Sequence, residues 1–375
     1  MASHGIPRVS ATATALGRSE PAKEKERTQI AQYQALEHGV VDRIKAQDYS
    51  AATLHATSAL LARNPEYYTI WNYRRLVLQD AIATELAPQT GDGTATQQDE
   101  DAAAKASLTL PQQEISLLLT EDLHFLIPLL KQYPKCYWIW NHRAWLLATA
   151  TTHLPTAKAV ELWQGEMALV TKMLALDSRN FHGWGYRRTA VGALEELRGS
   201  MVEPEFAYTT KMIGANLSNF SAWHNRSQLI PRLLSERLAG HEERKAMLDS
   251  ELELITRALY TDPYDQSLWF YHQYLMSTLD PSNKQTVAIL QPCTTEDRVR
   301  YLEQETESVK EMLDGAEDCK YIYQALLEYS GMHLEINDVE AVSTMEERKG
   351  WLGELRKIDP LREGRWRDLE RKMGL

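Results

Sequence analysis

The sequence predicts an all-α protein, a solenoid of helical hairpins, and three observations lead to this prediction. A tryptophan-centred motif recurs five times along the 375 residues. Successive tryptophans are 44, 39 and 46 residues apart from the second copy on, a spacing typical of helical-hairpin repeats. Apolar residues with helical spacing precede the motifs, so each motif helix has a partner helix. The tryptophans are Trp71, Trp140, Trp184, Trp223 and Trp269.

Each motif copy predicts one helix with a packed stripe, because residues three apart share a helix face. An aromatic residue stands three positions before the tryptophan in four copies: Tyr68, Tyr137, Phe181 and Phe220. An arginine stands three positions after it in the same copies: Arg74, Arg143, Arg187 and Arg226. Gln266 and His272 take these places in the fifth copy. We interpret the aromatic residues as packing between hairpins. The arginines are interpreted as structural too, stacked on a ring or bonded to turn carbonyls of the next hairpin.

The predicted helix starts and partner helices follow from local pattern. Asn64-Pro65 and Asp262-Pro263 place a capping side chain before a proline that would be the first helical residue. One partner helix would bury Leu248, Leu252, Ile255 and Leu259. Another would bury Leu162, Leu169, Met173 and Leu176.

The chain divides into a tail and one repeat domain. Residues 1–23 are predicted to be a disordered tail, and residues 24–375 the helical-repeat domain. A polar, acidic insert over 86–113 accounts for the gap of 69 residues between the first two tryptophans, and we expect it to be mobile. Residues 281–375 are predicted to form degenerate hairpins, including one at "CKYIYQALLEYS" that lacks its tryptophan, since terminal repeats are atypical.

Composition narrows the function. The 41 basic and 52 acidic residues give a net charge of −11, which argues against an array that binds nucleic acid. Three cysteines without a CxxC pair indicate a reducing compartment, and we expect a cytoplasmic protein. The sequence has no run of 18 apolar residues, so no membrane span is expected. Familiar nucleotide-binding, hydrolase and metal motifs are also missing, so the residues alone indicate an acidic helical-repeat protein that binds a partner.

The motif copies "NPEYYTIWNYRR", "NFHGWGYRR", "NFSAWHNRSQLIPRL" and "DPYDQSLWFYHQYLM" resemble the repeats of protein prenyltransferase α subunits, over about residues 24–375. Within that family they look most like the type II branch, whose enzymes are Rab geranylgeranyltransferases. The resemblance implies a right-handed, crescent-shaped superhelix in an obligate heterodimer with a β subunit. Zinc is expected on the β subunit, with no metal ligand in this chain. The implied reaction moves geranylgeranyl from its diphosphate to C-terminal cysteines of Rab GTPases, which an escort protein presents.

Lys135 is the candidate catalytic residue. The position five before the tryptophan varies between copies, so packing does not determine its identity; its occupants are Glu66, Lys135, Arg179, Ser218 and Tyr264. At the start of a helix, a bound diphosphate would also meet backbone N–H groups. The family resemblance implies that Lys135 contacts the diphosphate and that Tyr137 lines the same cleft. It likewise implies that His182, flanked by Asn180, faces the substrate, although capping and packing would also explain these two residues.

Two alternatives to the type II assignment remain open at this point. One is the α subunit shared by farnesyltransferase and type I geranylgeranyltransferase. The other is a non-enzymatic helical-repeat scaffold, although tetratricopeptide repeats run at 34 residues and the gaps here are longer and uneven.

Overall fold

The structure is a computed structural model that describes residues 19–87, 108–337 and 343–375. Within these ranges the chain forms helices and connecting turns, with no strand. The prediction of an all-α solenoid of hairpin repeats is confirmed. The chain divides into two compact units: unit 1 comprises residues 1–172 and 182–198, and unit 2 comprises residues 173–181 and 199–375. Each unit is described by itself.

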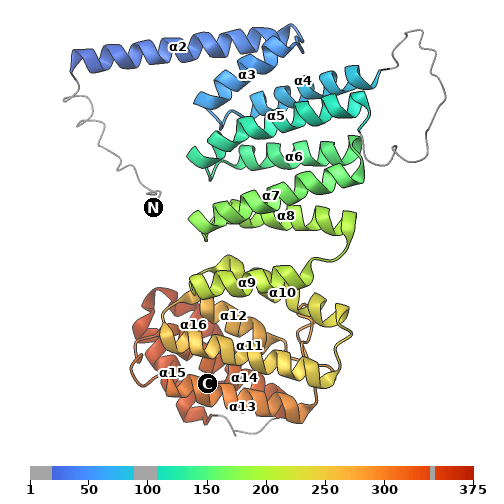
Figure 1. The fold of residues 1–375 in the computed structure, drawn as a ribbon. Helices are drawn as coiled ribbons and strands as arrows, with labels where there is room; N and C mark the ends of the chain where they lie inside the picture. Colours follow the sequence, from blue (N-terminus) through green and yellow to red (C-terminus); the bar gives the residue numbers. More distant parts are fainter. Residues whose placement is uncertain (1–18, 88–107, 338–342) are drawn as a thin grey trace, which may run out of the picture. The chain divides into compact units, whose positions relative to one another are not determined.

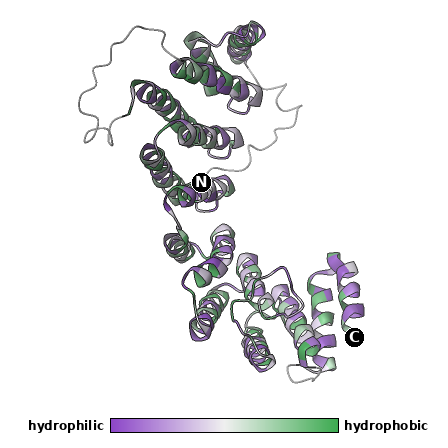
Figure 2. Ribbon diagram, turned by 90° about the vertical axis from the view of Figure 1, so that its right-hand side faces the viewer, coloured by the Kyte–Doolittle hydropathy of each residue, from purple (hydrophilic) through white to green (hydrophobic). Residues whose placement is uncertain are grey.

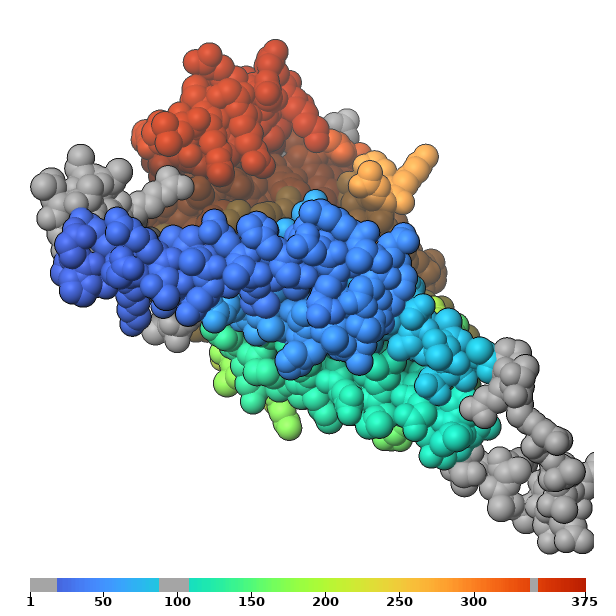
Figure 3. Space-filling view, turned by 90° about the horizontal axis from the view of Figure 1, so that it is seen from above, coloured from blue at the N-terminus to red at the C-terminus, as the bar shows by residue number. Residues whose placement is uncertain are grey.

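Unit 1 consists of a leading helix and three hairpins (Figure 1). The leading helix is α2 (Glu20–Lys45), and the hairpins are α3 (Ala51–Arg63) with α4 (Tyr68–Leu86), α5 (Leu110–Gln132) with α6 (Tyr137–His153), and α7 (Thr156–Leu176) with α8 (Phe181–Arg198). Helix α2 buries only Val40, and its N-terminal half extends beyond α3 (Figures 1 and 3). The last residues of α7 and the first residue of α8 fall in unit 2.

Unit 2 continues the hairpin pattern to the end of the chain. Its helices are α9 (Val202–Ala215) with α10 (Phe220–Glu236), α11 (His241–Thr261) with α12 (Gln266–Ser277), α13 (Thr295–Glu311) with α14 (Lys320–Asn337), and α15 (Met345–Ile358), the 3-10 turn η1 (Pro360–Arg362) and α16 (Glu363–Met373). Helices in both units carry hydrophobic and hydrophilic residues in alternation (Figure 2), as expected of amphipathic helices that bury one stripe.

The second helix of each hairpin begins later than the sequence suggested. Asn64 ends α3, and its Oδ1 accepts a hydrogen bond from the Glu66 backbone N–H at 3.2 Å. Asp262 does the same for the Tyr264 N–H at 3.0 Å. A side chain that bonds the backbone two residues on closes a turn rather than capping a helix. The prediction that helices start at the two prolines was therefore wrong.

The ends of the predicted tail and insert also shift. Residues 1–18 and 88–107 lie outside the described residues, but helices occupy the margins of both segments. Helix α2 starts at Glu20, with a proline in its first turn and a 2.7 Å ion pair between Glu20 and Lys23. A capping box between Thr109 and Gln112 fixes the start of α5 inside the range assigned to the insert.

The hairpin without a tryptophan is α13 with α14. Tyr323 takes the tryptophan position, and its hydroxyl donates to the carbonyl of Glu317 at 2.8 Å. Four repeat tryptophans donate the equivalent bond from the indole Nε1 to the carbonyl six residues before; the distances are 2.8 Å for Trp71 and Trp223, 3.0 Å for Trp140 and 2.7 Å for Trp269. Tyrosine therefore preserves the turn contact of the repeat in this degenerate copy.

Buried carboxylates join successive hairpins. Arg226 of α10 donates to Glu251 of the next hairpin at 2.7 and 2.6 Å, and Tyr271 donates to the same carboxylate at 2.6 Å. The equivalent sets are Arg74 and His142 on Asp122, and Arg143 and Tyr186 on Glu166. In the fifth copy, His272 Nε2 lies 2.9 Å from Glu305. Each acid therefore ties the preceding hairpin to its own.

The arginines also bind the first helix of their own hairpin. Arg226 Nη1 donates to the hydroxyls of Thr209 and Thr210 at 3.1 and 2.8 Å, and its guanidinium lies 3.8 Å from the centre of the Phe206 ring. Arg143 Nη1 donates to the Leu123 carbonyl at 2.8 Å. The carbonyls that accept from these arginines belong to the same hairpin, not to the next one.

The buried face of α7 differs from the prediction, whereas that of α11 agrees with it. Leu176 of α7 is 82% exposed, and Leu162 and Leu169 are only partly buried. The buried stripe instead runs through Trp163 and includes the carboxylate of Glu166. Met173 is buried as predicted, but at the adjacent apolar pairs 162–163 and 169–170 spacing alone does not show which residue faces the core, and the assignment took the wrong member of each pair.

Candidate functional site

Lys135 lies in the turn between α5 and α6, in unit 1. Its side chain is exposed, and it precedes Cys136, the residue at the N-cap of α6. No side-chain hydrogen bond caps this helix. The partial positive charge of a helix N-terminus adds to that of a nearby lysine. The turn therefore presents a positive site at the edge of unit 1.

Aromatic rings extend from this turn to both neighbouring hairpins. Tyr137, the first residue of α6, meets His182 of α8 edge to face, with ring centres 5.9 Å apart. Trp138 contacts Tyr137 at 5.8 Å and Tyr68 of α4 at 5.4 Å. We call Tyr68, Trp138, Tyr137 and His182 the aromatic row. The structure thus brings two of the predicted site residues, Tyr137 and His182, into contact, two residues along the chain from Lys135.

The aromatic positions three before the tryptophans are more exposed than expected. Tyr137 is 54% exposed, and Tyr68, Phe181 and Phe220 are exposed as well. The reason is their place in the helix: each is its first residue, at the edge of the repeat, whereas the tryptophan one turn later is buried. The interpretation of these rings as packing between hairpins agrees with the contacts of Tyr68 with Trp138, Tyr137 with His182 and Phe220 with Phe270, although the rings stay partly open to solvent. A row of exposed rings is typical of a surface that meets a partner or a ligand.

Asn180 occupies a position that links turns. Its side chain is 3% exposed, and it stands four residues before Trp184. In other hairpins the residue at this position donates to the turn of the preceding hairpin: Cys136 to the Pro65 carbonyl at 3.4 Å, Asn219 to Ser178 at 2.8 Å and Cys319 to Pro263 at 3.0 Å. Asn180 belongs to unit 2, whereas Lys135, Tyr137 and His182 belong to unit 1. Its contact with a substrate stays a prediction.

Cys136 is not placed to act as a nucleophile. Burial raises the pKa of its thiol to about 11, so the thiol stays protonated at neutral pH. Its sulfur instead donates to the carbonyl of Pro65. In the part of the chain that the structure describes, no three His, Cys, Asp or Glu side chains gather into a group that could hold a metal ion. These residues therefore do not fit a zinc site.

A family model described as "Protein prenyltransferase alpha subunit repeat" matches residues 51–81, 119–150, 163–194, 202–233 and 248–279. The chain is 34% identical over 375 residues to the geranylgeranyl transferase type-2 subunit alpha of Saccharomyces cerevisiae, with 97% of each chain covered. It is 33% identical to the Schizosaccharomyces pombe subunit of the same name, with 94% of each covered. The human subunit is 35% identical over 70% of this chain and 40% of its own length.

This chain belongs to the family of protein prenyltransferase α subunits, in its type-2 branch. The fold agrees with a solved structure described as Candida albicans protein geranylgeranyltransferase-I complexed with GGPP, at a TM-score of 0.58 and 19% identity over 92% of this chain and 91% of that one. That degree of identity bears on the fold alone.

Two members of the aromatic row in this α subunit were not predicted as site residues: Trp138, and Tyr68, which the sequence marked only as a repeat aromatic. A signal was available for Trp138. The position two before the repeat tryptophan holds small polar residues in three copies, Thr69, Ser221 and Ser267, and a ring in the other two, Trp138 and His182. The second and third hairpins therefore each carry an additional ring at this position, Trp138 and His182, and both rings contact Tyr137.

Proposed function

We propose that this chain is the α subunit of a type II protein geranylgeranyltransferase that is active only as a heterodimer with a β subunit. The close match to type-2 α subunits over nearly the whole chain supports the subunit assignment. The observation that carries the site is the exposed Lys135 beside the contacting rings of Tyr137 and His182.

The proposed reaction transfers a geranylgeranyl group from geranylgeranyl diphosphate to C-terminal cysteines of Rab GTPases that an escort protein presents. A bond forms between the cysteine sulfur and the first carbon of the prenyl group, the carbon–oxygen bond breaks, and diphosphate leaves with the bonding electrons. Zinc held by the β subunit would keep the cysteine in its nucleophilic thiolate form.

In this reaction, Lys135 would stabilise the departing diphosphate. Negative charge accumulates on its oxygen as the bond breaks, and a fixed cation there lowers the barrier. The side chain is exposed at a turn, so a ligand can reach it. Tyr137 and His182 would line the cleft beside the diphosphate, and their edge-to-face contact holds both rings in place.

We also propose that the enzyme works in the cytoplasm. Cys136, Cys293 and Cys319 are all free thiols, which suits a reducing compartment. Separately, none of the described helices is long and apolar enough to cross a membrane.

Co-expression tests the assignment. The purified chain alone should contain no stoichiometric zinc and transfer no prenyl group, and both properties should be present after co-expression with a type-2 β subunit. Metal analysis and a transfer assay with full-length Rab and escort protein measure them. One tightly bound zinc per isolated chain, or transfer without the β subunit, would overturn the proposal.

A further inference from the structure

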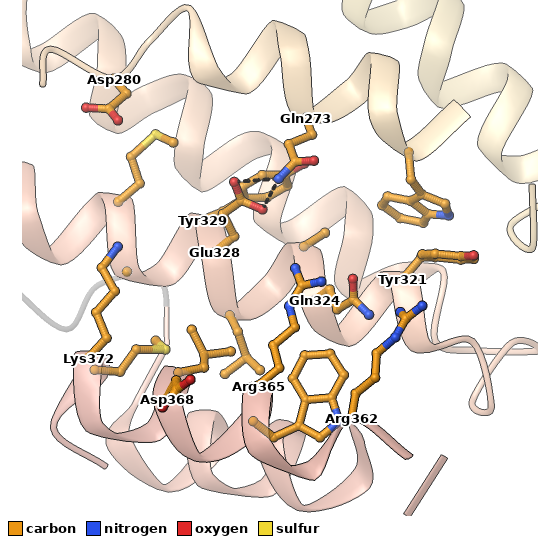
Figure 4. A pocket seen from close by; sticks show the side chains of 18 of the residues that line it. Gln273, Asp280, Tyr321, Gln324, Glu328, Tyr329, Arg362, Arg365, Asp368 and Lys372 are labelled. Atoms are coloured by element: carbon orange, nitrogen blue, oxygen red, sulfur yellow. Dashed lines mark hydrogen bonds between the residues drawn. The ribbon is translucent and has the colours of Figure 1, made fainter. Parts of the chain in front are cut away.

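A cavity of about 730 Å³ lies in unit 2 among α12, α14 and α16 (Figure 4). Its size falls within the range of small-molecule binding sites, roughly 300 to 1,000 Å³. None of the residues that line it belongs to the aromatic row or to the turn of Lys135. The proposed transfer reaction gives this cavity no role.

Much of the cavity wall is apolar. Helix α12 contributes Trp269 and Phe270, α14 contributes Leu327, and α16 contributes Leu369 and Met373. Phe270 is about half exposed, so part of its ring is available for contact. An aliphatic or aromatic body would remove this surface from water, which is favourable in proportion to the area buried.

Hydrogen-bond donors gather at one end. The Nε2 of Gln324 is buried and has no hydrogen-bond partner. The guanidinium groups of Arg362, in η1, and Arg365, in α16, extend toward α14, where Gln324 and Tyr321 lie (Figure 4). A buried donor without an acceptor is costly, by roughly 1 to 3 kcal/mol. This end of the cavity therefore offers positive charge and N–H groups, one of which has no acceptor.

Most of the acidic groups of the cavity already interact with other residues of the chain. Glu328 accepts two bonds from the Gln273 amide, at 2.8 and 2.7 Å. Asp368 is paired with Arg371, and Asp280 accepts from the Ser282 hydroxyl at 2.7 Å. Glu335 and Lys372 complete the charged lining. In Figure 4, Asp280, Asp368 and Lys372 lie at the end away from the two guanidinium groups.

The two arginines at the donor end, Arg362 and Arg365, have longer contacts with other residues than these acidic groups do. Arg362 has a longer contact with Asp359, at 3.4 Å, and Arg365 lies over the edge of the cavity with its guanidinium 5.5 Å from the Trp366 ring centre. Both side chains are exposed, so they can turn toward a ligand without breaking a buried ion pair. Arginine forms bidentate bonds with carboxylate and phosphate groups.

We propose that this cavity binds an amphiphilic anion, a carboxylate or phosphate attached to an apolar chain. Arg365, Arg362 and the Nε2 of Gln324 bind the head group, and the apolar walls from α12, α14 and α16 hold the chain. A small ligand suits the volume and the single donor cluster; a peptide segment of a protein partner is the competing occupant.

Calorimetric titration of the heterodimer tests the proposal. Dodecanoate and dodecyl phosphate, below their micelle concentrations, are the probes, and dodecanol and inorganic phosphate are the controls. Both amphiphiles should bind at least tenfold more tightly than either control, because head and chain each contribute. The tighter of the two identifies the head group. If dodecanol bound as tightly as the two amphiphiles, the cavity would have no anion site and the proposal would be overturned.

Variants locate the binding. Gly331 lines the cavity, and a Cβ built there meets only the terminal methyl of Met373, at 3.8 Å. Gly331→Leu should place a side chain inside the cavity and weaken the binding without harming the helix, since leucine is a better helix former than glycine. Because wild type and variant share the same β subunit, any binding to that subunit cancels in the comparison.

Arg365→Ala should weaken binding of both amphiphiles about tenfold, as expected for the loss of one charge-assisted bond. The matched control is Arg367→Ala on the same helix, which pairs with Glu363 at 3.0 Å and does not line the cavity. It should bind as wild type does. Binding that Gly331→Leu leaves unchanged would overturn the site. The proposal would also be overturned if the amphiphiles bound the isolated chain but not the heterodimer, since a protein would then be the occupant of the cavity.

Discussion

At the scale of single residues, exposed and buried positive charges have different roles in this chain. Lys135 projects into solvent from a turn, whereas Arg74, Arg143 and Arg226 of the repeats are buried and bonded to carboxylates. A solvated cation contributes little to the fold but is accessible to a ligand. A buried pair contributes through its partners, because removal of one partner leaves an uncompensated charge.

Lys135→Ala should therefore slow the transfer step of the heterodimer roughly 10- to 1000-fold, the range for loss of one preorganised charge-stabilising group. The melting temperature should hardly change, since the side chain is exposed. Single-turnover transfer and thermal unfolding measure the two effects. Lys135→Arg should restore part of the rate, because its fork differs in geometry from a point charge.

Lys131→Ala provides the control for this variant. Lys131 is an exposed lysine in the last turn of α5, four residues before Lys135. Its loss removes the same charge from the same region and should leave the rate nearly unchanged. A wild-type rate in Lys135→Ala with a lowered melting temperature would return Lys135 to a structural role.

His142 makes the stability of unit 1 depend on pH. Burial lowers its pKa, while the unfolded chain has the ordinary value of about 6.5. Burial acts to raise the pKa of Asp122, but the His142 hydrogen bond and the Arg74 charge prevail and lower it to about 2, so the acid stays ionised. The unfolded state then binds more protons below about pH 6.5, and the free energy of unfolding should fall as pH drops from 7.5 to 5.5.

Urea unfolding at these two pH values measures the change. Because other histidines also titrate, the comparison is with His142→Asn, which should be less stable at pH 7.5 but lose less stability on acidification. An equal loss in both proteins would show that His142 is not the group responsible.

At the scale of elements, α10 contains a proline that leaves one backbone carbonyl without its helical donor, and a neighbouring helix supplies a donor instead. Pro231 lies inside α10 and has no N–H to donate to the carbonyl four residues earlier, that of Ser227. The hydroxyl of Tyr274, in α12, donates to this carbonyl at 2.8 Å. The proline thus creates an acceptor that joins two consecutive hairpins of unit 2.

A double-mutant cycle tests this coupling. Tyr274→Phe should lower the free energy of unfolding by about 1 to 2 kcal/mol, because it leaves the carbonyl without a donor. In a Pro231→Ala background the cost should be smaller, because the alanine N–H then supplies the bond within α10. Equal costs in the two backgrounds would contradict the coupling.

The elements also show what the sequence could predict. Leucine spacing located the buried face of α11, although that face also contains the carboxylate of Glu251. The same reasoning failed for α7, where two apolar residues stand side by side at 162–163 and at 169–170, and where the buried stripe also contains Glu166. Such a carboxylate is buried only because Arg143 and Tyr186 reach it from two different helices. A single helix does not reveal partners that the fold brings together.

The candidate site also has features that the sequence predicted and features that only the fold determines. Lys135 stood out because the repeats do not share it, and the resemblance to a family supplied its role. Exposure of the Tyr137 ring could not be predicted, since the sequence does not show where the turn ends and the helix starts. His182 lies against Tyr137 through the packing of α6 and α8, which only the fold determines.

At the scale of the whole molecule, the type II assignment makes a prediction about substrate choice. The heterodimer should modify full-length Rab in the presence of its escort protein and ignore short peptides that end in the C-a-a-X pattern read by type I enzymes. Transfer of labelled geranylgeranyl to both substrates measures the preference. Efficient turnover of such a peptide without an escort would favour the α subunit shared by farnesyltransferase and type I geranylgeranyltransferase.

The bond between Arg74 and Asp122 spans residues 88–107 in the sequence, yet it is built like the bonds of the shorter connections. Side-chain pairing, rather than the length of the linker, thus sets how the first hairpin meets the second. A polypeptide cut between residues 88 and 107 would keep every such bond within unit 1. The two fragments would then stay associated as a nicked but assembled subunit, and this linker is the place to attach a label or a fused domain.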